Sequence, residues 1–134
     1  MNRSVLLIED NEQNRYLLTF LLTKSGFTVT SAVDGPRGIA LASERAPSVI
    51  LLDIQLPTMD GYAVARALRA QVLLDDTPIV AVTSYAMPGD RERALAAGCD
   101  GYIEKPIDPA TFVVEVERIV RLGRAPHEDG NAAR

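Results

Sequence analysis

Residues able to carry metal and phosphate chemistry stand at the ends of four short apolar segments of this chain. Glu9 and Asp10 follow the first of them, Asp53 ends another, Thr83 ends a third, and Lys105 follows the last. If these ends meet in the fold, three carboxylates repel one another unless a cation offsets their charge. Oxygen ligands of this kind suit Mg²⁺ (or Mn²⁺). A metal, an ammonium and a hydroxyl around one aspartate are the groups that phosphoryl transfer to a carboxylate requires.

The spacing of apolar residues predicts elements that bring these ends together. Short apolar runs predict strands at 4–8, 27–32, 48–53, 78–83 and 101–104. Helical periodicity predicts helices at 11–25, 35–45, 62–71, 90–97 and 108–122. Regular alternation implies a parallel sheet with helices on both faces. We therefore expect an α/β fold, a flavodoxin-like (βα)5 doubly wound parallel sheet with strand order 2-1-3-4-5, whose site lies at the carboxyl ends of the strands.

Length and composition indicate one ordinary domain with an acidic surface. The chain has 134 residues and a formal net charge of −4, which disfavours a nucleic-acid partner. We expect a domain at 1–122 and a flexible polar tail at 123–134, where periodicity is lost. Cys99 is the only cysteine, and no segment approaches the ~20 apolar residues of a membrane span. We expect a cytoplasmic protein without a leader sequence or a membrane partner.

Four separated motifs resemble the receiver domain of bacterial two-component response regulators. They are Glu9-Asp10, the segment 53–61, Thr83 and Lys105-Pro106, and the resemblance covers about residues 4–122. Segment 9–15 and the lack of an output domain are similar to single-domain regulators of the DivK type. The resemblance implies a protein that accepts a phosphoryl group from a histidine kinase or a histidine phosphotransfer protein. It would signal through contacts with downstream proteins or relay the phosphoryl group.

The resemblance also implies the metal ligands and the acceptor. Asp53 matches the phosphorylated aspartate, and Asp10 matches the direct metal ligand. Glu9 matches the partner acid that holds the metal or its water. The backbone carbonyl of Gln55 matches the third protein ligand.

Three further residues match the groups that respond to the phosphoryl group. Thr83 matches the hydroxyl that contacts it, and Lys105 matches the ammonium that pairs with it. Tyr102 matches the aromatic residue that turns inward when Thr83 moves. The peptide before Pro106 is often cis in the family, as X-Pro bonds allow.

Other readings of the same residues remain open at this point. An aspartate-nucleophile phosphohydrolase of the haloacid dehalogenase type needs a second aspartate two residues after the first, where this chain has Gln55. A degenerate receiver would bind partners without taking a phosphoryl group. A flavin or nucleotide site lacks its phosphate-binding loop here. His127, the only histidine, lies in the expected tail, so the chain is not expected to be a histidine phosphodonor.

Three aromatic residues near the predicted site suggest two further roles. Tyr16 and Phe20 fall on the side of the first helix opposite Leu18 and Leu22, and we hypothesise that they help to dock a helical phosphodonor. Tyr85, two residues after Thr83, is bulky enough to shield the phosphoryl group, which predicts slow self-hydrolysis. The decay rate of the phosphorylated protein compared with that of Tyr85→Ala tests this second hypothesis.

Overall fold

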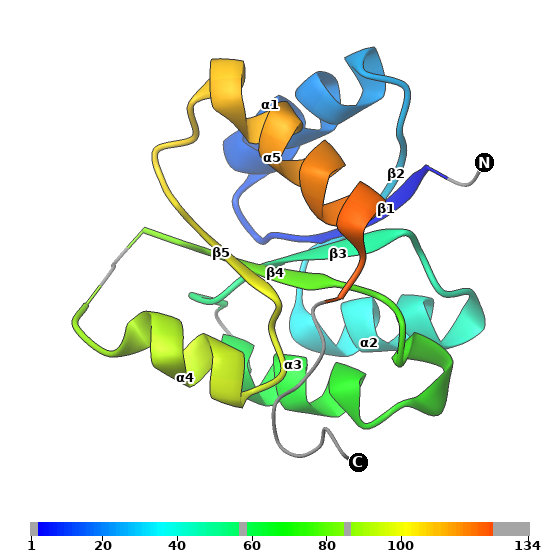
Figure 1. Ribbon diagram of the computed structural model, residues 1–134, viewed down its shortest axis with the longest axis vertical. Coiled ribbons are helices and arrows are strands. Elements are labelled where there is room, and N and C mark those ends of the chain that lie inside the picture. Colours follow the sequence, from blue (N-terminus) through cyan, green and yellow to red (C-terminus); the bar gives the residue numbers. More distant parts are fainter. Residues whose placement is uncertain (1–2, 57–58, 85–86, 125–134) are drawn as a thin grey trace.

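The sheet has the predicted strand order. The computed structural model describes residues 3–56, 59–84 and 87–124 (Figure 1). Its strands are β1 (Ser4–Ile8), β2 (Thr28–Ala32), β3 (Val49–Asp53), β4 (Ile79–Thr83) and β5 (Gly101–Glu104). They form one parallel sheet in the order β2-β1-β3-β4-β5, which confirms the flavodoxin-like α/β prediction.

The helices begin and end within two residues of their predicted bounds. They are α1 (Glu12–Lys24), α2 (Gly35–Glu44), α3 (Gly61–Arg69), α4 (Asp90–Ala96) and α5 (Pro109–Leu122). Four of them begin at a side chain that accepts a first-turn N–H, namely Asn11, Asp34, Asp60 and Asp108. A short 3₁₀ helix, η1 (Val72–Leu74), was not predicted. Within the part of the chain that the structure describes, no helix is long and apolar enough to cross a membrane.

The helices form one layer on each face of the sheet. Helices α1 and α5 cover one face, and α2, α3 and α4 cover the other (Figure 1). Because successive strand residues point to opposite faces, the central strands supply both cores. Val5, Leu7 and Leu51 pack with α1 and α5, whereas Leu6, Ile8 and others pack on the opposite side. Strands β3 and β4 are buried throughout, which explains their uninterrupted apolar sequences.

A close backbone approach fixes the loop that follows β3. The Gly61 N–H donates to the Ile54 carbonyl oxygen at 3.2 Å. A Cβ at position 61 would lie 2.5 Å from Ile54 Cα, so only glycine fits there. The start of α3 is thereby held against the residue that follows Asp53.

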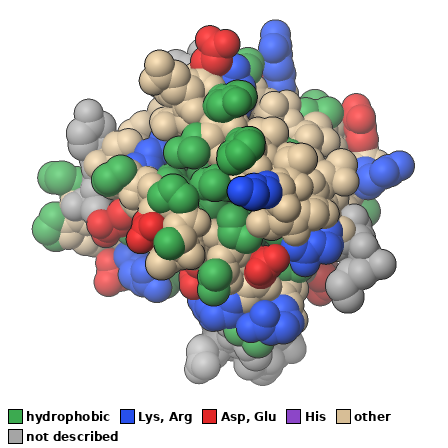
Figure 2. Space-filling model, turned by 90° about the horizontal axis from the view of Figure 1, so that it is seen from above, with side chains coloured by type: hydrophobic (Ala, Val, Ile, Leu, Met, Phe, Trp, Pro, Cys, Tyr) green, Lys and Arg blue, Asp and Glu red, His purple; other side chains and the backbone are tan. Residues whose placement is uncertain are grey.

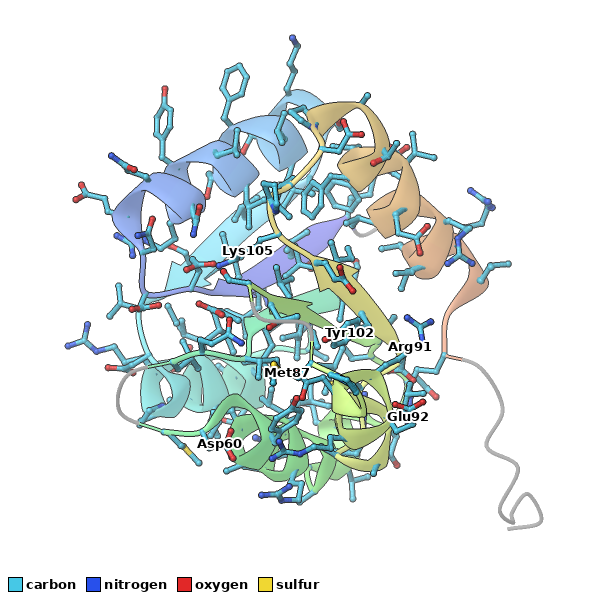
Figure 3. The ribbon with its side chains drawn as sticks, turned by 90° about the vertical axis from the view of Figure 1, so that its left-hand side faces the viewer. Asp60, Met87, Arg91, Glu92, Tyr102 and Lys105 are labelled. Carbon is cyan, nitrogen blue, oxygen red and sulfur yellow. The ribbon has the colours of Figure 1, made fainter. Side chains whose placement is uncertain are left out.

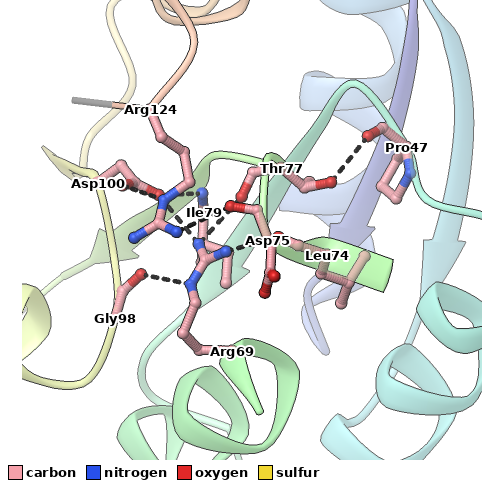
Figure 4. A network of polar contacts seen from close by, with 9 residues as sticks. All are labelled: Pro47, Arg69, Leu74, Asp75, Thr77, Ile79, Gly98, Asp100 and Arg124. Carbon is pink, nitrogen blue, oxygen red and sulfur yellow. Dashed lines mark hydrogen bonds and ion pairs between the residues drawn. The ribbon is translucent and has the colours of Figure 1, made fainter. Parts of the chain in front are cut away.

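A half-buried ionic cluster closes the opposite end of the sheet (Figure 4). The Asp100 carboxylate accepts from Arg69 Nη2 at 3.0 Å, Arg124 Nε at 2.8 Å and the Ile79 N–H at 3.0 Å. Arg69 also donates to the carbonyl oxygens of Leu74, Thr77 and Gly98. Arg124, which lies past the expected domain end at 122, thus packs against the body of the domain. The remainder of the expected tail, with His127, lies outside the described residues.

Candidate functional site

The carboxyl ends of β1 and β3 bring three carboxylates together. In the parallel register Ile8 pairs with Leu52, so Glu9 and Asp10 follow β1 next to Asp53 at the end of β3. Oxygen atoms of Glu9, Asp10 and Asp53 all lie within 4.8 Å of one another. Glu9 is 1% exposed and Asp53 is 4% exposed, whereas Asp10 faces solvent. The structure therefore brings together the acidic residues that the sequence singled out.

Lys105, which follows β5 (Figure 3), supplies a positive charge to this cluster. Its Nζ lies 3.1 Å from Glu9 Oε1 and 3.7 Å from Asp53 Oδ2. The other Glu9 oxygen, Oε2, accepts from the Asn11 N–H at 3.1 Å. The Lys105 N–H donates to the Thr83 carbonyl oxygen at 2.8 Å, and the Lys105–Pro106 peptide is cis. The backbone thus holds the ammonium over the two buried carboxylates.

The charges of the cluster are not balanced by Lys105 alone. Burial and the neighbouring Glu9 raise the pKa of Asp53 to about 7, although the Gln55 N–H and Lys105 oppose the rise. Among the described residues, one ammonium faces three carboxyl groups here. A hard divalent cation with oxygen ligands would offset the remaining charge, and the exposed Asp10 leaves one side of the cluster open to it. The donor set therefore fits such a cation.

The Gln55 side chain makes contacts that the sequence did not predict. Its Nε2 donates to Thr83 Oγ1, and its Oε1 accepts from the Ser84 N–H at 2.9 Å. The Gln55 N–H donates to Asp53 Oδ1 at 2.9 Å. One residue therefore links the predicted acceptor to the predicted switch hydroxyl. The metal-binding role of its carbonyl stays a prediction.

Arg15 is a further residue that the sequence did not single out. Its Nη1 donates to the carbonyl oxygens of Glu9 at 3.1 Å and Asp10 at 3.2 Å. The guanidinium of α1 thereby fixes the backbone that carries the first two carboxylates. No periodicity distinguishes Arg15 from other polar residues of the helix, so only the structure reveals this contact.

Tyr102 lies on β5 beside a cavity of about 300 Å³ that Met87, Arg91 and Glu92 also line (Figure 3). Its ring packs against the core, and its hydroxyl is buried with no hydrogen-bond partner among the described residues. Burial also raises its pKa. The hydroxyl is thus already buried in this structure, and its predicted response to Thr83 stays a prediction. Tyr85, the predicted shield, lies outside the described residues.

The outer face of α1 is apolar as predicted. Tyr16 is 74% exposed and Phe20 is 51% exposed, whereas Leu18 and Leu22 are buried. A shallow groove of about 340 Å³ runs along this face from Tyr16 to Lys24. Figure 2 shows hydrophobic side chains gathered on the side of the molecule that α1 and α5 form. The docking role of this face stays a prediction.

Comparisons with known proteins agree with the fold. A family model described as "Response regulator receiver domain" matches residues 5–117. The polar-differentiation response regulator DivK of Brucella ovis is 39% identical over 87% of this chain and 95% of its own. The chemotaxis protein CheY4 of Vibrio cholerae superposes with a TM-score of 0.84 at 28% identity, covering 89% of this chain and 99% of its own.

A second solved structure bears on the cation. It is the receiver domain of the sensor histidine kinase PA1611 from Pseudomonas aeruginosa, described with a magnesium ion coordinated in its active-site cleft. It is 36% identical to this chain, with a TM-score of 0.78, and the match covers 91% of this chain and 97% of that one.

Proposed function

This chain belongs to the family of response regulator receiver domains, and from that premise we propose that Asp53 accepts a phosphoryl group from a histidine kinase or a histidine phosphotransfer protein. The observation that carries the proposal is the buried Asp53 carboxylate, with Lys105 Nζ 3.7 Å away and two further carboxylates within 4.8 Å. Two further carboxylates so close would only destabilise an ionised aspartate that had a purely structural role. A phosphoryl acceptor needs the ammonium, together with a cation that the carboxylates would hold, because the phosphoryl group brings further negative charge.

The proposed transfer follows from the groups around Asp53. One Asp53 oxygen attacks phosphorus in line, and the bond from phosphorus to the donor nitrogen breaks as the new bond forms. Mg²⁺ (or Mn²⁺), held by Glu9, Asp10, Asp53 and the Gln55 carbonyl, would offset charge on the transferring oxygens. Lys105 supplies the second positive charge.

We propose that phosphorylation changes the shape of the surface that partner proteins bind. With Asp53 phosphorylated, the Thr83 hydroxyl turns to the phosphoryl group, and Tyr102 and the surface formed by α4, β5 and α5 shift between two arrangements. Downstream proteins bind that surface, or the phosphoryl group is transferred to a further protein of a phosphorelay. As part of the proposal the protein acts in the cytoplasm, binds neither nucleic acid nor membrane directly, and does not turn over substrate as an enzyme.

Phosphorylation by a small donor tests the proposal. We expect acetyl phosphate with Mg²⁺ to add one phosphoryl group, measured by intact mass, and we expect the Asp53→Asn variant to gain none. Asp60→Asn is the matched control, because the exposed Asp60 only caps α3 and asparagine caps equally well. Unmodified wild-type protein would contradict the proposal, and continuous release of phosphate would favour the phosphohydrolase.

Removing the apolar face of α1 should slow transfer from a protein donor only. We expect Tyr16→Ala with Phe20→Ala to reduce the rate of phosphotransfer from the cognate kinase roughly tenfold, because exposed aromatic side chains commonly anchor interfaces. The rate with acetyl phosphate should stay within twofold of wild type. Both rates are measured by intact mass over time.

The control for this variant is a second exposed apolar pair. Val72 and Leu73 of η1 are 80% and 53% exposed, and they follow α3 at the opposite end of the sheet. Val72→Ala with Leu73→Ala should change neither rate. Equal slowing of both reactions in the α1 variant would refute the docking role.

A further inference from the structure

The carboxamide of Gln55 engages both polar groups at the end of β4. Its Nε2 donates to the hydroxyl oxygen of Thr83, and its Oε1 accepts from the Ser84 N–H at 2.9 Å. A backbone N–H only donates, so the amide oxygen must face Ser84 and the NH₂ group must face Thr83. Thr83 is 2% exposed, so water competes poorly for this contact. These two hydrogen bonds form a bridge from the Gln55 side chain to the end of β4, and the orientation of its carboxamide is therefore fixed.

The same residue is tied to the predicted acceptor. The Gln55 N–H donates to Asp53 Oδ1 at 2.9 Å, and the strand register places Asp53 opposite Val82, directly before Thr83. The Thr83 carbonyl oxygen is held by the Lys105 N–H at 2.8 Å. Hydrogen bonds thus hold the backbone around the bridge, so any rearrangement falls to the side chains of Gln55 and Thr83.

A phosphoryl group on Asp53 would compete for these same partners. Its oxygens are strong acceptors, and the Thr83 hydroxyl and the Ser84 N–H are donors at the end of the neighbouring strand. We propose that Gln55 is a positioning residue whose carboxamide occupies the Thr83 hydroxyl and the Ser84 N–H in the unphosphorylated protein and must be displaced when the phosphoryl group engages them. The inference rests on the proposed function, because it concerns what phosphorylation of Asp53 has to displace.

The bridge then determines how readily the protein changes to its phosphorylated arrangement. An intramolecular hydrogen bond typically shifts an equilibrium about fivefold, so two independent ones give about 25-fold. The Ser84 contact is exposed to water, so we expect a bias toward the unphosphorylated arrangement of roughly tenfold. Only the difference between the two states counts toward this bias. Removing the carboxamide while keeping the backbone should therefore make the phosphorylated arrangement easier to reach.

The Gln55→Met variant tests this directly. Methionine has a similar length and no hydrogen-bonding amide, and the backbone groups of residue 55 remain. The probe is beryllofluoride with Mg²⁺, a stand-in for the phosphoryl group, titrated while the backbone amide signals of Thr83 and Ser84 are followed by NMR. We expect the variant to bind beryllofluoride about tenfold more tightly than wild type. In the probe-free protein its Ser84 amide hydrogen should exchange at least tenfold faster.

A matched control comes from Gln71, half-buried and without a capping hydrogen bond from its side chain. Gln71→Met should leave both measurements unchanged. The affinity for Mg²⁺ alone should be the same in Gln55→Met and wild type, because the side chain of residue 55 is not a metal ligand. A changed Mg²⁺ affinity would overturn the inference by placing the effect in the acidic cluster.

The remaining outcomes separate the inference from the proposed function. Equal or weaker beryllofluoride binding by Gln55→Met, with normal binding by wild type, overturns the inference alone. Failure of the wild-type protein to bind beryllofluoride and to gain a phosphoryl group overturns the proposed function. In that case faster exchange of the Ser84 amide would still show that the Gln55 hydrogen bonds exist, but they would not control a response to phosphorylation.

Discussion

Replacing Lys105 by methionine is expected to slow phosphorylation of Asp53 by acetyl phosphate about 100-fold. The Lys105 ammonium lies 3.1 Å from Glu9 Oε1 and 3.7 Å from Asp53 Oδ2, and its side chain is 11% exposed. Loss of one preorganised charge-stabilising donor typically costs about 10²–10³ in rate. The variant keeps the length of the side chain, so the rate from an intact-mass time course reports the missing charge.

A second measurement shows whether the acidic cluster survives the substitution. Removing a cation that competes for the carboxylates should make Mg²⁺ bind more tightly to Lys105→Met than to wild type. Lys105→Arg retains the charge in a planar fork of different shape and should phosphorylate at an intermediate rate. Lys24→Met, at the exposed end of α1, should behave as wild type. A Lys105→Met rate within threefold of wild type would show that the ammonium does not assist the transfer.

The layout of this site was predictable because buried parallel strands leave a plain mark in the sequence. A strand covered on both faces is an uninterrupted apolar run, and its end is where polar residues return. Asp53 and Thr83 end two such runs, and the parallel order places their ends at one edge of the sheet. The convergence of the acidic residues thus followed from strand ends and topology.

Other contacts have no local signature, because they join residues whose separation depends on packing. Asp100 meets Arg69 across 31 positions of the chain, and no periodicity relates them. The Gln55 bridge to Thr83 spans 28 positions and depends on a side-chain rotamer. The helix η1 has only three residues, too few to show a helical repeat. The sequence therefore predicted which residue types meet at the site, but not which hydrogen bonds they make.

Converting Asp53 to asparagine is expected to stabilise the metal-free protein above pH 7. Burial, with a further contribution from Glu9, raises the pKa of Asp53 to about 7 from an ordinary value of 3.8. Between these two values the folded protein holds a proton that the unfolded chain has released, so its stability falls as pH rises from about 4 to about 7. Each pKa unit corresponds to about 1.4 kcal/mol, so Asp53→Asn should gain on the order of 4 kcal/mol at pH 8.

Urea denaturation of both proteins with a chelator present, at pH 4 and pH 8, measures this difference. The gain should be close to zero at pH 4, where asparagine replaces a carboxyl group that is already neutral in the folded state. Mg²⁺ at pH 8 should stabilise wild type and narrow the gap, because a ligand that binds only the folded state raises its stability. A gain of the same size at both pH values would mean that it comes from contacts of the new amide and not from the loss of a negative charge. In that case burial of negative charge would not be the feature that prepares this residue for a cation and a phosphoryl group.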